Sequence, residues 1–194
     1  AVRDASPYVG GGFLYAPLPL KKEKKMNDKT LRKLIYSALF AALCCGATLA
    51  LRFPTPIGGY IHAGDALVLL GAFTLGPAWG AFAAGLGSLL ADLLSGFALY
   101  APASFVIKAL VALIAAAILS SGMFKNKTAL AVFAGAIAEL FMVGGYFFYD
   151  GVILKFGLAA MGDIPANLIQ AVFAVIAGAA LYKALEKFIK QQKI

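Results

Sequence analysis

The sequence predicts an all-α, polytopic membrane protein with six transmembrane helices and both termini in the cytoplasm. The first observation is composition: 62% of the 194 residues are hydrophobic and 13% are charged, which is more apolar surface than a soluble domain of this size buries. The second is that apolar residues gather in segments near the ~20 residues that a helix needs to cross a bilayer. The third is that basic residues cluster in alternate connections, as the positive-inside rule requires.

Six apolar segments follow one another after Thr30. They cover residues 31–51, 64–75, 78–95, 103–121, 128–148 and 163–187. The second ends at Gly76-Pro77 and is too short to span the bilayer upright unless the preceding loop adds to it. Alanine, leucine and glycine dominate these segments without an alternating period, so helices are expected and strands are not.

The basic residues orient these segments. Of the 17 lysines and arginines, seven lie within 21–33, two are Lys125 and Lys127, and four lie within 183–193. With six crossings these clusters share one side, which predicts a multi-pass membrane protein with cytoplasmic termini. The outer side then receives the loops 53–63, 96–102 and 149–162. Because the net charge of +8 is divided among connections, nucleic acid is not an expected partner.

The first 25 residues differ from the rest of the chain. They combine Gly, Pro and Tyr without a period, and Met26 then begins a stretch that reads like a natural start. They also lack the order of a secretory signal, which puts positive charge before its apolar run. Residues 1–25 are therefore expected to be an extension, a tag or a flexible tail, and residues 26–194 to form the six-helix substrate-binding domain.

Small residues recur every four positions in the first apolar segment, at Ala38, Ala42, Gly46 and Ala50. This spacing places them on one helical face, where another helix can approach closely. Two interpretations stay open at this point. The face either packs inside the bundle or docks a separate membrane partner.

Ionisable residues inside a membrane are costly and need a reason. The candidates here are Asp65, Asp92, Lys108 and Glu139. Asp92 and Lys108 flank a short outer loop at similar depth, so we expect either a structural ion pair between their helices or contacts to a polar substrate. Asp65 begins the second segment, where free N–H groups favour a carboxylate as a helix cap.

Further polar side chains converge on the outer half of the predicted bundle. Glu139 and Tyr146 share a face of the fifth segment, Asn167 and Gln170 share a face of the sixth, and Tyr100 lies in the outer loop. Such a set suits a small flat polar molecule, because aromatic rings stack on it while amides and carboxylates bind its edges. The alternative is hydrogen bonding between helices. The only histidine, His62, is either a lid residue over this site or a solvated loop side chain.

Motifs for enzymes and for nucleotide binding are missing from the sequence. It contains no GxxxxGK[ST], no HExxH and no GxSxG, so we expect no ATP site, no catalytic residues and no metal or cofactor. The two cysteines, Cys44 and Cys45, are adjacent in an apolar segment and are expected to act as small hydrophobic residues.

Residues 54–110 carry a family resemblance. The stretch contains a Gly-Tyr-Ile-His-x-Gly-Asp run, a Leu-Gly-Pro turn, a Gly-x-Gly-Ser-x-x-Ala-Asp run and a Tyr-Ala-Pro…Lys segment. Together with the small-residue stripe and the six segments, it resembles the substrate-binding S component of an energy-coupling factor (ECF) vitamin transporter.

The resemblance implies a protein that captures a vitamin from outside and delivers it with a transmembrane T component and two cytoplasmic ABC-type ATPases. It also implies that the stripe meets the T component and that the loop after the first helix covers the site. The branch looks most like members for hydroxymethylpyrimidine or pyridoxine, while riboflavin, folate and pantothenate are alternatives. The rival functions are a self-sufficient secondary transporter, a membrane-embedded enzyme and a purely structural subunit.

Overall fold

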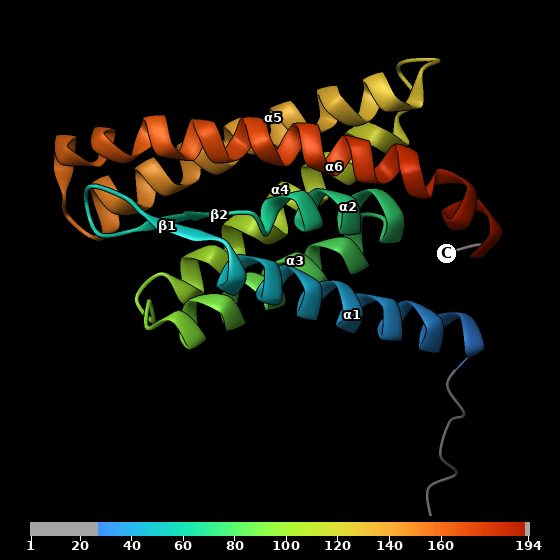
Figure 1. Cartoon of the computed structure of the whole chain (residues 1–194), viewed down its shortest axis with the longest axis horizontal. Helices are drawn as coiled ribbons and strands as arrows, with labels where there is room; N and C mark the ends of the chain where they lie inside the picture. Colours follow the sequence, from blue (N-terminus) through green and yellow to red (C-terminus); the bar gives the residue numbers. More distant parts are fainter. Residues whose placement is uncertain (1–26, 193–194) are drawn as a thin grey trace, which may run out of the picture.

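The computed structural model describes residues 27–192, except for the side chains of 189, 190 and 192, and shows a bundle of six helices (Figure 1). The 1–25 extension lies outside the described residues. The elements in order are α1 Asp28–Ala50, β1 Arg52–Pro54, β2 Tyr60–His62, α2 Asp65–Leu75, α3 Pro77–Ser95, α4 Ala101–Ser120, α5 Lys127–Phe148, a π-helical turn Tyr149–Ile153, a 3₁₀ segment Gly157–Asp163 and α6 Ile164–Gln192.

The helices agree with the predicted segments to within a few residues, and local sequence explains their ends. Asn27 and Asn126 cap α1 and α5, because each side-chain oxygen accepts a hydrogen bond from a free backbone N–H of the first turn. Pro77 occupies the first turn of α3, where its missing N–H is not needed. Gly96 ends α3 in the left-handed region, at φ 84°.

Helix α2 is short and central. Its 11 residues span about 16 Å at 1.5 Å per residue, roughly half of the ~30 Å hydrocarbon core. All of them except Leu67 are buried, because α2 packs against α1, α3, α4 and α6. Within the described residues, five other helices are long and apolar enough to cross a membrane. The outer half of the bundle beside α2 is therefore free for other elements.

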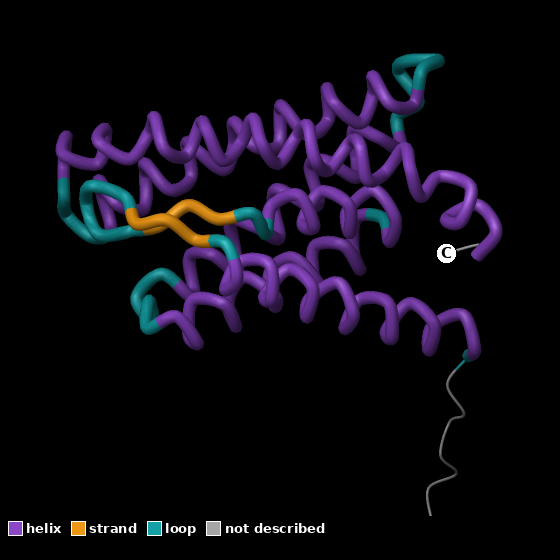
Figure 2. Tube along the Cα trace, in the orientation of Figure 1, coloured by secondary structure: helices purple, strands orange, loops and turns teal. Residues whose placement is uncertain are grey.

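A β-hairpin lies in this outer half, where the sequence led us to expect a loop without strands. Strands β1 and β2 pair antiparallel, with Arg52 opposite His62 and Pro54 opposite Tyr60 (Figure 2). Each strand has only three residues, which is too few for a periodic signal in the sequence. The hairpin extends from the end of α1 across to the start of α2.

The ends of the bundle separate the basic clusters from the hairpin. In Figure 1, the beginning of α1, the α4–α5 connection with Lys125 and Lys127 and the last turns of α6 lie at one end. The hairpin, the α3–α4 connection and the α5–α6 connection lie at the other. This arrangement agrees with the predicted topology, in which the basic end is cytoplasmic.

Small residues form much of the interior, whereas large apolar residues face outward. Ala112, Ala115, Ala134, Ala138 and Ala174 have no exposed surface, so α4, α5 and α6 approach closely. Many leucines, valines and phenylalanines of α1, α5 and α6 are exposed instead. Large apolar residues on the outside, the reverse of a soluble protein, are expected for helices whose outer faces contact lipid.

The small-residue stripe of α1 lies on the outside of the bundle. Ala38, Ala42, Gly46 and Ala50 are all exposed, and a Cβ atom added at Gly46 would meet no atom within 4 Å. The stripe thus does not pack inside the described part of the chain.

Candidate functional site

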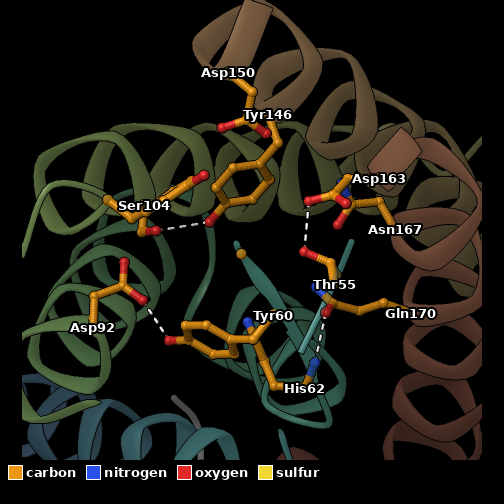
Figure 3. Close-up of a pocket in the computed structure, with 12 residues that line it drawn as sticks. Thr55, Tyr60, His62, Asp92, Ser104, Tyr146, Asp150, Asp163, Asn167 and Gln170 are labelled. Atoms are coloured by element: carbon orange, nitrogen blue, oxygen red, sulfur yellow. Dashed lines mark hydrogen bonds between the residues drawn. The ribbon is translucent and has the colours of Figure 1, made fainter. Parts of the chain in front are cut away.

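A polar cavity lies at the outer end, enclosed by the hairpin, α3, α4, α5 and α6 (Figure 3). Its side chains leave a volume of about 30 Å³. The lining residues are Thr55, Gly59, Tyr60, His62, Asp92, Tyr100, Ser104, Tyr146, Asp150, Asp163, Asn167 and Gln170. Six of the nine residues that the sequence nominated as vitamin contacts therefore meet at one place: His62, Asp92, Tyr100, Tyr146, Asn167 and Gln170.

The tip of the hairpin is fastened to the last residue of the 3₁₀ segment. Asp163 accepts a hydrogen bond of 2.5 Å from the Thr55 hydroxyl and one of 3.3 Å from the Ile57 backbone N–H. Gly58, at φ +94°, forms the turn that brings both donors to the same carboxylate. One acidic side chain thus holds the hairpin over the cavity.

The middle of the hairpin is held by Asp92, which corrects one prediction. The Tyr60 hydroxyl donates a hydrogen bond to Asp92 Oδ1, and the Tyr60 ring packs on Phe97 with centroids 4.7 Å apart. The predicted ion pair between Asp92 and Lys108 is not formed. That prediction rested on the similar depth of the two residues in adjacent helices. In the structure, the Tyr60 hydroxyl of the hairpin is the hydrogen-bond partner of Asp92 instead.

Lys108 instead forms a salt bridge with Asp65, at 2.7 Å between Nζ and Oδ2, and both residues are fully buried. Asp65 Oδ2 also accepts a hydrogen bond of 2.5 Å from Gln170 Nε2. Asp65 was expected to cap α2, yet its side chain makes no cap hydrogen bond. Its carboxylate points to α4 and α6, because the charged Lys108 ammonium, a stronger donor than a backbone N–H, and the Gln170 amide both donate to it there.

His62 has a defined protonation state and defined partners. Its Nδ1 accepts a hydrogen bond from the Gly64 N–H at 3.1 Å and lies 3.3 Å from the Thr48 hydroxyl. Burial lowers the pKa of His62 to about 4; the Asp65 carboxylate opposes this shift and the Lys108 ammonium adds to it. The ring is therefore neutral at ordinary pH, and the half-buried side chain lies at the base of the hairpin.

Tyrosines form the aromatic wall of the cavity. The Tyr146 hydroxyl lies 2.8 Å from Ser104 Oγ, and Lys108 Nζ lies 5.1 Å from the centroid of the Tyr146 ring, within range of a cation–π contact. Tyr100 packs against Tyr149 with centroids 5.7 Å apart. Burial, assisted by the Asp150 carboxylate, raises the pKa of Tyr100, so its phenol is a hydrogen-bond donor at ordinary pH.

Three nominated residues do not line the cavity: Asp65, Lys108 and Glu139. Glu139 is 1% exposed, and neither of its carboxylate oxygens has a hydrogen-bond partner within the described residues. Asp65 and Lys108 lie beside the cavity. Asp65 contacts the lining residue Gln170, and Lys108 contacts the lining residue Tyr146. Whether any of the three contacts a vitamin stays a prediction.

Sequence reasoning missed the other six lining residues, which are Thr55, Gly59, Tyr60, Ser104, Asp150 and Asp163. Asp150 and Asp163 flank the outer connection that was assigned to a plain loop. One signal pointed to them, namely two carboxylates on the side of the membrane that carries few basic residues.

The charges of the cavity indicate the kind of molecule it accepts. Asp92, Asp150 and Asp163 face the opening from three sides (Figure 3). No lysine or arginine is among the lining residues that the structure describes. Asp92 Oδ2 and Asp150 Oδ1 have no hydrogen-bond partner in the described structure. Buried acceptors of this kind favour a ligand that donates hydrogen bonds.

Comparison with known proteins gives consistent results. The family model described as the S component of the ECF-type riboflavin transporter matches residues 28–187. A thiamine precursor transporter, HmpT of Lactococcus lactis, is 28% identical over 173 residues, which are 88% of this chain and 95% of that protein. An uncharacterized protein of Pyrococcus woesei is 32% identical over 143 residues, 73% of this chain and 93% of that one.

A solved structure described as the S component of a bacterial ECF transporter superposes with a TM-score of 0.68. It is 27% identical in sequence, and the match covers 83% of this chain and 99% of that one. The matching family and this structural neighbour are transporter S components and not enzymes. The helical bundle, its apolar spans and the family match over residues 28–187 together show that this multi-pass membrane chain belongs to the family of ECF-type transporter S components.

Proposed function

We propose that this protein captures a small heterocycle rich in hydrogen-bond donors, with hydroxymethylpyrimidine or pyridoxine preferred over riboflavin, for ECF-type vitamin uptake. The observation that carries the proposal is the set of three carboxylates around the cavity, with no lysine or arginine among the described lining residues. An amino or hydroxymethyl group on an aromatic ring supplies the donors that these carboxylates lack.

The same charges disfavour acidic vitamins. The carboxylates of folate or pantothenate would lie close to Asp92, Asp150 and Asp163 without a compensating cation. Tyr60, Tyr100 and Tyr146 supply aromatic surface for a flat ring. The name of the Lactococcus relative, a thiamine precursor transporter, supports a pyrimidine, whereas the name of the family model is the argument for riboflavin.

The size of the cavity implies that the hairpin moves. A volume of about 30 Å³ is about the share of one water molecule in the liquid, so a heterocycle enters only after side chains withdraw. The hairpin tip is the element best suited to do so, because Asp163 holds it through only two hydrogen bonds. We therefore assign the segment 52–62 as the lid of the site.

Delivery would use the partners of the family. We propose that a T component docks on the small-residue stripe of α1, whose four residues are exposed, and that two ABC-type ATPases supply the energy from the cytoplasm. We also propose that the protein lies in a prokaryotic cell (plasma) membrane; the positions of the basic clusters support an orientation with the cavity facing outward and the basic end inward.

The test is direct binding by the purified protein in lipid nanodiscs, measured by isothermal titration calorimetry with hydroxymethylpyrimidine, pyridoxine, riboflavin and pantothenate. We expect hydroxymethylpyrimidine or pyridoxine to bind at least 100-fold more tightly than riboflavin and pantothenate. Tighter binding of riboflavin would overturn the substrate assignment, and no binding of any vitamin would overturn the function.

Asn167 provides a residue-level test. Replacing Asn167 by Ala should weaken vitamin binding by more than about 1 kcal/mol, the usual scale for a buried hydrogen bond. Asn126→Ala is the matched control, because the same truncation then occurs at the cytoplasmic end, where Asn126 caps α5. Equal affinities of the two variants would exclude Asn167 from the binding site.

A further inference from the structure

The base of the lid is connected to a buried ion pair by a chain of hydrogen bonds. The His62 backbone N–H of β2 donates to Gln170 Oε1 at 2.7 Å. Gln170 Nε2 donates to Asp65 Oδ2 at 2.5 Å, and Lys108 Nζ donates to the same oxygen at 2.7 Å. The chain thus links the lid to α6, α2 and α4.

This chain permits only one orientation of the Gln170 amide. Asp65, paired with Lys108, accepts hydrogen bonds, and the backbone N–H of His62 only donates one. The Gln170 nitrogen must therefore face Asp65, so that its oxygen faces β2. The ion pair decides which atom Gln170 offers to the lid.

Burying two charges is energetically costly, which suggests that the Lys108–Asp65 ion pair does more than fill space in the core. Lys108 and Asp65 are fully buried and lie outside the cavity lining. A buried ion pair is weak evidence of stability, because well-packed apolar side chains often replace such pairs without loss. Fixing the orientation of one amide is a role that apolar side chains cannot supply.

The other contacts of the lid make its base the natural pivot. The His62 ring is held at the same point by Gly64 and Thr48. Beside the base of the lid, an apolar cavity of about 340 Å³ opens at the surface of the bundle, so hydrogen bonds and not packed side chains hold the base on that side. That cavity is lined by Leu51, Phe53, Ile61, His62, Ala63, Ile169, Gln170 and Phe173. The base is therefore fixed by several hydrogen bonds, whereas Asp163 is the only hydrogen-bond partner that the described residues outside the hairpin offer to the tip.

We infer that Lys108, Asp65 and Gln170 are positioning residues that anchor the pivot of the lid, and that the Lys108–Asp65 ion pair acts on the vitamin site by orienting Gln170. This inference deepens the proposed function and rests on it for the effect on the vitamin. The claim that these residues anchor the lid does not depend on which molecule the protein binds.

Two double variants separate orientation of Gln170 from a merely structural ion pair. Asp65→Asn with Lys108→Met removes both charges but keeps an oxygen that accepts from Gln170. Asp65→Leu with Lys108→Met removes the charges and the acceptor together. Hydrogen–deuterium exchange of peptides covering 57–63, in nanodiscs without added vitamin, reports whether the base of the lid is held.

We expect the Asn/Met variant to exchange within about threefold of the original protein. The Leu/Met variant should exchange at least tenfold faster in this segment, with unchanged exchange in α3 and α5. The single variant Gln170→Met should resemble Leu/Met, and it provides the test if a double variant does not fold.

Equal exchange in the two double variants, or no change in Gln170→Met, would overturn the inference. Because no vitamin is present, this result is independent of the substrate assignment. Vitamin dissociation measured afterwards should be faster in Leu/Met than in Asn/Met. Faster lid exchange without faster dissociation would overturn the functional part alone.

Discussion

The fastening of the lid tip can be tested by a double-mutant cycle between Thr55 and Asp163. The Thr55 hydroxyl donates a hydrogen bond of 2.5 Å to the Asp163 carboxylate. Thr55→Val removes this bond and keeps the shape of the side chain. Asp163→Ala removes this bond and also the weaker one, at 3.3 Å, from the Ile57 N–H.

The expected magnitude follows from these contacts. A hydrogen bond to a charged group contributes about 1.5–3 kcal/mol, so Thr55→Val should weaken vitamin binding by about 2 kcal/mol, or about 30-fold. Asp163→Ala should cost more, because it also removes the second bond. The coupling energy between the two substitutions should be at least about 1 kcal/mol, since each removes the same bond.

Isothermal titration calorimetry on the four proteins measures the cycle, and stopped-flow dissociation shows where the loss arises. Closure of the lid after binding predicts that most of the loss is faster dissociation. Additive effects within about 0.5 kcal/mol would refute the reasoning, because they would mean that Asp163 and Thr55 act on the vitamin separately and do not fasten the lid.

Three further predictions concern other parts of the chain. Gly46→Leu should reduce vitamin uptake in cells by more than tenfold and leave binding unchanged, because a Cβ atom added at this exposed position meets no described atom within 4 Å but the larger side chain obstructs a docked helix. Val132→Leu, on an exposed part of α5, is the control and should leave uptake intact, whereas loss of binding in Gly46→Leu would contradict the docking role. Gly64→Ala should destabilise the protein by about 1–3 kcal/mol, because its Cβ would lie 2.1 Å from Thr48 Oγ1; an unchanged melting temperature would exclude this close approach. The stability of the fold, followed by thermal melts, should be full above about pH 6.5 and fall as the pH approaches 4, because the unfolded chain binds a proton at His62 that the folded protein, with a pKa of about 4 for this residue, excludes; the loss is limited to about 3 kcal/mol at ~1.4 kcal/mol per pKa unit. His62→Asn, whose side-chain oxygen replaces Nδ1 as an acceptor, should lack this dependence, and an equal pH profile in both proteins would assign it to the cavity carboxylates.

Much of the fold could be predicted because membrane helices are specified locally. Apolar length, proline and glycine punctuation and lysine clusters all lie within a few residues of the helix ends that they determine. The short length of α2 could be predicted because the Gly76-Pro77 turn ends its apolar segment. The hairpin was not predictable in the same way, since three-residue strands are stabilised by side-chain contacts to α3 and α6 and carry no period of their own.

Many residues of the candidate site could be predicted from the sequence, but the contacts that they make with one another could not. Polar residues in the outer halves of helices indicated a cavity, and six nominated residues do line it. Partner choice depends on which helices are neighbours across the bundle, and the sequence does not state that α2 lies against α4. Lys108 was therefore paired with the nearest carboxylate along the chain, Asp92, rather than with Asp65.

The short central helix also bears on the route that a vitamin must take. Inward of the cavity, α2 and the small-residue faces of α4 and α5 fill the bundle, and Leu69, Val111, Ala112 and Ala134 have no exposed surface. In the part of the chain that the structure describes, packed side chains thus occupy the place where a conduit would run. Close-packed interiors do not open such a path without large rearrangement. Under the proposed function, we therefore expect a vitamin bound at the outer end to reach the cytoplasm by a movement of the whole bundle and not by a path through it.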